Sequence, residues 1–281
     1  MPFGTTHLYT LTPMVSRTAF SKFAALVTLP LLVACGDSSG PEPSARGFNV
    51  VGRGSVSSHF TSDLWLHGSV ALTGTRGNRG GNVGDRVFVW DISAPDSPLL
   101  TNEVVVEAST VNDVKIRDDG LIAVITHENS SDALNGITIL DFANPLQPTL
   151  VARFTDGLET GVHNVWIDGD YVYAALDGPG QGMRIVDITN PANPQVVASF
   201  TTGFTFLHDI YVRDGLAFLS YWSAGLIILD VGNGIGGGSP ENPIEMGRVL
   251  TAGGQTHNAW YWPATGYVFV GEEDFDTPGI M

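Results

Sequence analysis

The stretch MRIVDITNPANPQVVASF, from Met183 to Phe200, decides the fold because its pattern returns along the chain. Its apolar run ends at Asp187, a polar turn with two prolines follows, and a second apolar run completes it. Turn residues between two short apolar runs are typical of two strands joined by a tight connection. The same pattern occurs as RVFVWDISAPDSPLL at 86–100, as ITILDFANPLQPTLV at 137–151 and, with an expanded turn, from LIILDV at 226–231.

One aspartate ends each apolar run and sets the length of the repeat. These residues are Asp91, Asp141, Asp187 and Asp230, and the steps between them are 50, 46 and 43 residues. A carboxylate at this place can accept backbone N–H bonds from the turn that follows, so we predict a structural role for all four. The prolines stiffen a connection in which no ladder donor is needed.

A hairpin pattern precedes each copy, at 62–74, 112–126, 163–176, 208–221 and 257–271. Each consists of a strand, a turn such as Asp-Gly and a second strand. The repeat unit therefore has four strands. Repeats of about 40 to 50 residues with four strands are expected of propeller blades, which stack round an axis because one blade cannot bury both its faces.

Composition agrees with an all-β chain and excludes one class of partner. The 281 residues include 34 glycines and 16 prolines, and only 15% are charged, which favours short strands joined by turns. The formal net charge is −16, and the only lysines are Lys22 and Lys115. Nucleic-acid binding depends on clustered basic residues, so we expect no nucleic-acid partner.

The elements RIVDI and IILDV resemble the repeat that names the LVIVD-repeat family of bacterial β-propellers. The resemblance covers residues 48–281 and implies a propeller of four-stranded blades, without naming an activity. We expect four complete blades, half a blade at the carboxyl end and a lone outer strand at 48–56 (FNVVGRGSV). The last unit has no third strand in the sequence, so either the chain is a fragment of a longer protein, or another chain or a rearranged pairing covers the edge.

The amino-terminal region resembles a bacterial lipoprotein signal. Arg17 and Lys22 precede an apolar run at 23–34 that is too short to span a bilayer comfortably. The run ends in LVAC, which resembles a lipobox, where cleavage precedes a cysteine that is then lipidated. The cysteine is Cys35, the only one in the chain, so no intramolecular disulfide can form.

These features predict three segments. Residues 1–34 are a lipoprotein signal peptide, whose translation starts at Met1 or at Met14. Residues 35–47 are the lipidated cysteine and a flexible tether rich in Pro, Ser and Gly. Residues 48–281 are the propeller, incomplete at its carboxyl end. The expected partner of the lipid is a membrane, and the expected location is the bacterial cell envelope, on its periplasmic or cell-surface side.

Polar residues recur at the head of the first strand of each unit. If these strands line a central channel, the side chains lie at one height on neighbouring blades. They are His163 with Asn164, His208 with Asp209, His257 with Asn258, Asn112 with Asp113, and Ser62 with Asp63. Three converging imidazoles can bind a divalent metal, which makes His163, His208 and His257 candidate ligands. The alternative is that all these residues form hydrogen bonds to backbone between blades.

Three function classes remain open from the sequence, and the third is a purely structural surface protein. The first is a binding module for an unidentified protein or small molecule. The second is a metal-dependent hydrolase or lyase at the mouth of the channel, with carboxylates from the loops that follow the hairpins, at Glu128, Glu272, Glu273 and Asp274. No HExxH motif is present, and no cofactor other than a divalent metal is indicated.

Overall fold

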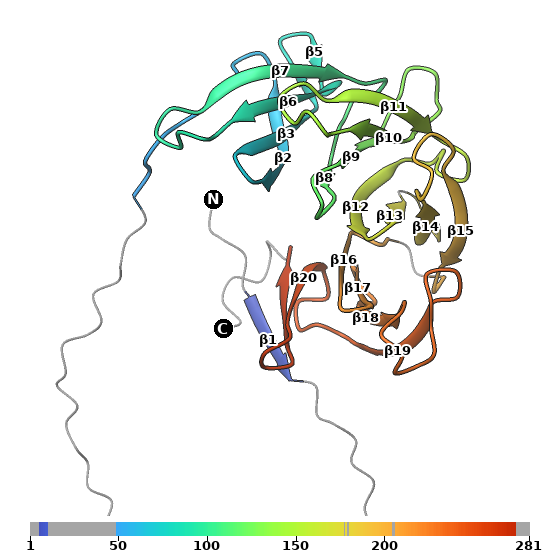
Figure 1. Ribbon diagram of the computed structural model, residues 1–281. Coiled ribbons are helices and arrows are strands. Elements are labelled where there is room, and N and C mark those ends of the chain that lie inside the picture. Colours follow the sequence, from blue (N-terminus) through green and yellow to red (C-terminus); the bar gives the residue numbers. More distant parts are fainter. Residues whose placement is uncertain (1–5, 11–48, 177, 179, 204–205, 274–281) are drawn as a thin grey trace, which may run out of the picture.

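The computed structural model describes residues 6–10, 49–176, 178, 180–203 and 206–273 (Figure 1). These residues form strands joined by turns and loops and include no helix, so none of them provides a helix that is long and apolar enough to cross a membrane. Four sheets have four antiparallel strands each, and adjacent strands in the sheet follow one another in the chain. The prediction of an all-β chain built from four-stranded units is confirmed.

We call the sheets blades one to five. Blade one contains β2 (Phe60–His67), β3 (Val70–Arg76), β6 (Arg86–Asp91) and β7 (Leu99–Val105), with the short pair β4 (Asn78–Arg79) and β5 (Asn82–Val83) in a connection. Blade two contains β8 (Val114–Ile116), β9 (Ile122–His127), β10 (Gly136–Asp141) and β11 (Thr149–Phe154). Blade three contains β12 (Val162–Asp168), β13 (Tyr171–Leu176), β14 (Met183–Asp187) and β15 (Gln195–Phe200). Blade four contains β16 (Asp209–Arg213), β17 (Leu216–Tyr221), β18 (Gly225–Asp230) and β19 (Ile244–Val249). Blade five contains β20 (Thr256–Trp262), β21 (Tyr267–Glu272) and β1 (Thr6–Thr10).

Apolar side chains on facing blades hold the blades together. Blades one and two bury Leu72 and Val89 against Val114 and Ile125, and the same kind of cluster joins each later pair. Burying apolar area of this kind is the main stabilising contribution to such a fold. Figure 1 shows the blades as an arc that is open between blade one and blade five.

The repeated aspartates lie at the ends of β6, β10, β14 and β18 and accept backbone hydrogen bonds from the turn that follows. The donors are the N–H groups of Ser93, Ala143, Thr189 and Gly232, at 2.7–2.9 Å from the Oδ1 of Asp91, Asp141, Asp187 and Asp230. In the expanded glycine-rich turn, Asp230 also accepts bonds from Asn233 and Gly236. Hydrogen bonds from these backbone N–H groups, that of Gly232 first, lower the pKa of Asp230 to about 2.

Two details of the chain ends differ from the sequence prediction. The outer strand expected at 48–56 does not form, and residues 49–58 contain no strand. Instead, Gly54 lies against the ring of Trp90, and Val56 packs on the apolar face of blade one that no other blade covers. The third strand of blade five, expected to be absent, is β1, which pairs antiparallel with β21. The unpaired N–H and C=O groups on the edge of β21 explain why an extended segment can add there.

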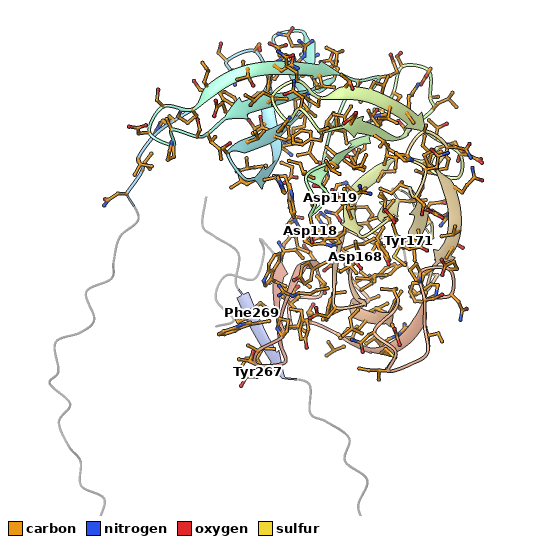
Figure 2. The ribbon with its side chains drawn as sticks, in the orientation of Figure 1. Asp118, Asp119, Asp168, Tyr171, Tyr267 and Phe269 are labelled. Atoms are coloured by element: carbon orange, nitrogen blue, oxygen red, sulfur yellow. The ribbon has the colours of Figure 1, made fainter. Side chains whose placement is uncertain are left out.

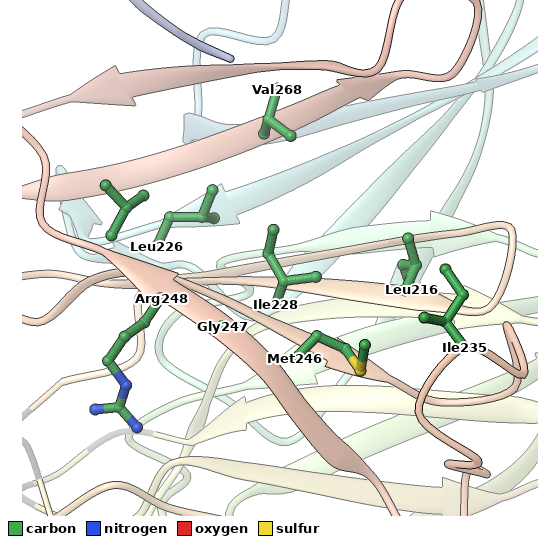
Figure 3. Close-up of a pocket in the computed structure, with 9 residues that line it drawn as sticks. Leu216, Leu226, Ile228, Ile235, Met246, Gly247, Arg248 and Val268 are labelled. Carbon is green, nitrogen blue, oxygen red and sulfur yellow. The ribbon is translucent and has the colours of Figure 1, made fainter. Parts of the chain in front are cut away.

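Blade five is narrower than blade four and leaves part of its face open. A pocket of about 320 Å³ lies there, lined by Leu226 and Ile228 of β18, Met246 of β19 and Val268 of β21 (Figure 3). Val268 belongs to the cluster that joins the two blades. On β19, farthest from the channel, Met246 is 40% exposed. The pocket is therefore an uncovered part of a blade face.

Near the axis, polar side chains of one blade bond the backbone of the next. Three residues at equivalent positions, in β2, just before β8 and in β12, each accept a hydrogen bond from a backbone N–H of the following blade. The pairs are Asp63 with Val114 at 3.2 Å, Asp113 with Val165 at 2.8 Å and Asn164 with Ile210 at 3.0 Å. One residue earlier, Asn112 donates to the carbonyl of His163 at 2.8 Å. These bonds fix the height of each blade relative to its neighbour.

Lys115 is buried between these acids. Its ammonium contacts the carboxylate of Asp113 and lies 3.4 Å from that of Asp63, while only 6% of the lysine is exposed. Burial lowers the pKa of Lys115, but the charges of Asp113 and Asp63 outweigh it and the pKa is raised. The lysine is therefore charged, and Asp113 is the main group that compensates it.

We expect Asp113→Ala to lower the free energy of unfolding by about 3–5 kcal/mol, because it leaves the Lys115 ammonium buried without its main partner. The double variant Asp113→Ala, Lys115→Met removes both charges and is expected to recover much of that loss. Urea unfolding measures both, with the exposed residue change Asp96→Ala as a control that is expected to have little effect. A single variant as stable as the wild type contradicts the structural role of the pair.

The imidazole of His127, at the end of β9, predicts a pH-dependent stability. It is fully buried, and its Nε2 lies 2.7 Å from the hydroxyl of Thr138. Burial first, and the charge of Arg153 second, lower the pKa of His127 from 6.5 to about 4. Between those values the unfolded chain binds the proton and the folded chain does not, so the contribution to stability that is present above pH 6.5 is lost toward pH 4.

For this residue alone, the free energy of unfolding is expected to fall by about 2 kcal/mol between pH 7 and pH 5. Urea unfolding at both pH values, for the wild type and for His127→Gln, isolates the contribution because every other titrating group is common to the two proteins. Equal losses of stability in both would show that His127 does not carry it.

Candidate functional site

The first strand of each blade lies nearest the axis, and together these strands form the walls of a channel. The strands β2, β12, β16 and β20, with the residues around β8, provide the lining of two cavities that share Asp63, Asp113, Asn164 and Asp209. One cavity lies on the side where these strands begin and includes the three histidines of the candidate set, and it has a volume of about 420 Å³.

β-Bulges at the head of these strands aim two consecutive side chains at the channel. In β12, Val162 pairs with Leu176 and Asn164 with Ala175, so His163 is an extra residue in the ladder. In β20, His257 is the extra residue in the same way. Successive side chains of a regular strand point to opposite faces, and a bulge removes that restriction. This is how His163 and Asn164, and likewise His257 and Asn258, line one channel.

The three histidines lie close together at one end of the channel. The Nε2 atoms of His163 and His208 are 3.2 Å apart, and the rings of His208 and His257 have centroids 4.1 Å apart. Glu273, which follows β21, adds a carboxylate: its Oε2 is 3.5 Å from His257 Nε2 and 3.9 Å from His208 Nε2. Ligand atoms of His208, His257 and Glu273 all lie within 4.8 Å of one another.

The hydrogen bonds of two imidazoles determine which nitrogen carries the proton. His163 Nδ1 lies 3.0 Å from a carboxylate oxygen of Glu128, and His208 Nδ1 lies 3.0 Å from the carbonyl of His257. Ionised carboxylates and carbonyls only accept hydrogen bonds, so both Nδ1 atoms donate. The Nε2 atom of His208 then presents a lone pair toward Nε2 of His163, 3.2 Å away.

Burial favours the neutral form of two of the histidines. Burial, with smaller contributions from His257 and His163, lowers the pKa of His208 to about 3. Burial also lowers the pKa of His257, although the charge of Glu273 opposes it. Below the histidines, burial raises the pKa of Asp209 to about 7.

Aromatic side chains cover one side of the cluster. The ring of Phe206 contacts His163 at 5.3 Å between centroids, and Trp222 contacts His208 at 5.4 Å. Trp222 has a backbone φ of 26°, a conformation that is unusual for a residue other than glycine. An apolar wall of this kind limits the access of water to polar groups behind it.

The structure relates the other candidates to this cluster in different ways. Asn112, Asp113, Asn164 and Asp63 bond neighbouring blades, and Asp209 and Asn258 line the second cavity. Glu272 is buried and bonds the N–H of Gln255, so it does not join the histidines. Cys35 and Asp274 lie outside the described residues. Sequence patterns did not point to Phe206, whose ring contacts His163, or to Arg76, which lines the cavity with the histidines, since neither belongs to the repeated position.

Comparisons with known proteins agree with this architecture. A family model described as LVIVD repeat matches residues 131–156, 161–202 and 208–251, which cover the later part of blade two, blade three and blade four. A search of curated proteins finds no match for the chain.

Among solved structures, the β-propeller domain of Cps50 (Swd1) from Myceliophteria thermophila is similar, with a TM-score of 0.52 and 12% identity over 76% of this chain and 67% of that chain. The computationally designed Ika8 protein has a TM-score of 0.50 and 12% identity, over 72% of this chain and 52% of the other, so this chain spans about half of that chain. At such identities the likeness concerns the fold alone. The chain therefore contains LVIVD repeats between residues 131 and 251, and its four-stranded sheets have a β-propeller type of fold.

Proposed function

We propose that the protein is a lipid-anchored binding module of the bacterial cell envelope that holds a divalent transition-metal ion at one mouth of its channel. A propeller of repeated blades is suited to binding, because it displays side chains from several blades round one axis. The observation that carries the metal proposal is the convergence of three imidazoles and one carboxylate at that mouth.

The distances between ligand atoms fit a tetrahedral ion. Ligands about 2.0–2.1 Å from zinc at tetrahedral angles lie roughly 3.4 Å from one another. The separations here are 3.2 Å between His163 and His208, 3.5 Å between His257 and Glu273, and 3.9 Å between His208 and Glu273. Ligand atoms of His208, His257 and Glu273 are all within 4.8 Å of one another, and His163 completes the set only if its ring moves toward them.

The surroundings of the ligands support the same assignment. Metal-binding histidines commonly donate their second N–H to a carboxylate or a backbone carbonyl, which orients the ring. Glu128 plays this part for His163, and the carbonyl of His257 plays it for His208. Imidazole nitrogens together with one carboxylate favour Zn²⁺ or a similar ion over Mg²⁺ or Ca²⁺.

The second function class, a metal-dependent hydrolase or lyase, is supported by one further feature. The cavity beside the histidines contains Asp209, a carboxyl group with a raised pKa, and the guanidinium of Arg76. A metal-bound water, a proton acceptor and a cation for an anionic group are the components of hydrolysis. Binding remains our first proposal, because the interblade hydrogen bonds already account for most of the polar residues below the histidines.

The anchor part of the proposal rests on the amino-terminal sequence. The apolar run and LVAC place Cys35 where a lipobox requires it, and the polar segment after it allows the propeller to stand off the membrane. The net charge of −16 suits a soluble domain exposed outside the cytoplasm.

We expect the full chain, titrated with Zn²⁺, to bind one ion per molecule that survives dialysis. His208→Ala removes a ligand and is expected to weaken binding by about a hundredfold or more, and Glu128→Gln, which acts on His163, by about 10- to 100-fold. Calorimetry measures both, and the absorption of Co²⁺ in the same site reports a tetrahedral geometry. His67→Ala, on the first strand of blade one but outside the cluster, is the control and is expected to leave binding unchanged.

Equal zinc affinity in the wild type and His208→Ala contradicts the metal site. Hydrolysis of a p-nitrophenyl ester by the zinc-loaded chain, lost in His208→Ala and Asp209→Asn but not in His67→Ala, favours the enzyme over the binding module.

We expect the mature protein, extracted from bacterial membranes, to have the mass of residues 35–281 with a diacylglyceryl group and an acyl chain on Cys35. Cys35→Ala is expected to shift the protein from the membrane fraction to the soluble fraction or to leave it unprocessed. Intact-mass measurement and fractionation decide between these outcomes. Membrane association that is unchanged in Cys35→Ala rules out this anchor, and a larger mass shows that the chain continues beyond residue 281.

A further inference from the structure

Aromatic side chains surround the channel at the end opposite the histidines. They occupy the same position on the inner strands β2, β12, β16 and β20. Each follows by two residues the acid or amide that lines the channel (Asp63, Asn164, Asp209 or Asn258), and so lies about 7 Å farther along the channel. They are Trp65, Trp166, Tyr211 and Trp260, and with the acids below them they line a cavity of about 320 Å³. This volume is at the lower end of the range for small-molecule sites.

The aromatic rings contact one another in sequence round the wall. Trp65 and Trp166 are edge to face with centroids 5.4 Å apart, and Trp166 and Tyr211 are so at 4.7 Å. Tyr211 and Trp260 are stacked at 4.5 Å with an interplanar angle of 24°. Tyr211 is 3% exposed and is held by its neighbours, whereas Trp260 is 52% exposed at the open end of the wall.

This wall already holds one ammonium group. The Nζ of Lys115 lies 4.7 Å from the ring centroid of Trp65, a separation typical of a cation–π contact. The same Nζ is paired with Asp113 and Asp63. The arrangement of an ammonium between an indole face and carboxylates is therefore present once in the chain.

Asp209 provides a third carboxylate in the cavity, beside Asp63 and Asp113. It lacks the hydrogen bond to the next blade that those two residues make. Asp63 and Asp113 each accept an N–H from the next blade and pair with Lys115. Within the part of the chain that the structure describes, Asp209 accepts no hydrogen bond from blade five, and its carboxyl group interacts instead with the charge of Lys115 and with the backbone of Ile210. It lines the same cavity as Tyr211 and Trp260.

Carboxylates also surround the entrance on this side. Figure 2 shows Asp118 and Asp168 close together near the centre of the arc. Burial, followed by the charges of Asp118 and Asp214, raises the pKa of Asp168. The nearest arginines are engaged: Arg117 pairs with Asp119 and Asp170, and Arg213 lies 3.8 Å from Asp214. An entrance lined in this way attracts cations and repels anions.

We propose that this cavity binds a small organic cation, an alkylammonium or trimethylammonium group, between the face of Trp260 and the carboxylate of Asp209. The aromatic faces stabilise the diffuse positive charge, and Asp209 compensates it. Aromatic rings beside carboxylates can also bind neutral sugars, which stack on the ring faces. Three carboxylates, Asp63, Asp113 and Asp209, line the cavity beside a single lysine, and this excess of negative charge favours the cation. The proposal does not depend on the metal at the other mouth.

The probe is tetramethylammonium chloride, titrated into the full chain in the presence of EDTA and followed by calorimetry and tryptophan fluorescence, against sodium chloride at equal ionic strength. We expect saturable binding by the wild type. Trp260→Ala and Asp209→Asn are each expected to weaken it about tenfold, and Trp260→Phe less than Trp260→Ala. Trp262→Ala is the matched control, since Trp262 is on the same strand, is 50% exposed and does not line the cavity.

Circular dichroism verifies that each variant is folded. Three results overturn the proposal: no saturable response in the wild type, an equal loss in Trp260→Ala and Trp262→Ala, or unchanged affinity in Asp209→Asn. Binding of a neutral monosaccharide, tested in parallel, that is lost in Trp260→Ala but retained in Asp209→Asn would assign the cavity to a carbohydrate instead.

Discussion

The burial of each blade against the next is the constraint on which the other features depend. A four-stranded sheet of this composition has two apolar faces. All six residues of β9 are buried, because blades lie on both sides of this strand. The first strand of each blade is consequently fixed at the axis, where few side chains from other elements can reach. The channel, its acids and its histidines follow from that placement. Where a neighbour is missing, apolar residues stay exposed, as Leu64 and Leu66 do on blade one at 53% and 55%.

The polar residues at the axis divide into those that hold the blades and those that remain available to a ligand. Asp63, Asp113 and Asn164 bond the backbone of the next blade, so their recurrence is explained by architecture alone. The sites proposed above arise where the repeat departs from this rule. His163 and His257 are inserted by bulges, and Asp209 makes no bond to blade five among the described residues. In the proposed sites, a position that bonds neighbouring blades in some repeats is thus available to a ligand in others.

Much of the blade could be predicted from the sequence because its determinants are local. The apolar runs that end in Asp141, Asp187 and Asp230 became the third strands of their blades, and the turns after them bond those carboxylates as expected from composition. The bulges could not be predicted, since they depend on the register of a partner strand. For the same reason the sequence named Glu128, Glu272 and Glu273 as candidate carboxylates beside the histidines but could not tell their roles. Glu128 bonds His163, Glu273 lies beside His208 and His257, and Glu272 bonds the backbone instead. The predicted strand at 48–56 failed because pairing requires a free edge nearby, and β1 lies on the edge of β21 instead.

The pairing of β1 with β21 relates the proposed lipid anchor at Cys35 to the proposed metal site on blade five. Residues 6–10 precede the proposed cleavage point at Cys35, so pairing of β1 with β21 and a mature lipoprotein belong to different forms of the chain. If the chain is cleaved before Cys35 as proposed, the edge of β21 would present unpaired N–H and C=O groups, which favour the addition of another strand. Glu273 follows β21 directly, and the bulge that aims His257 at the channel lies in the pairing of β20 with β21. The geometry of the proposed metal ligands on blade five would then depend on the strand that covers that edge.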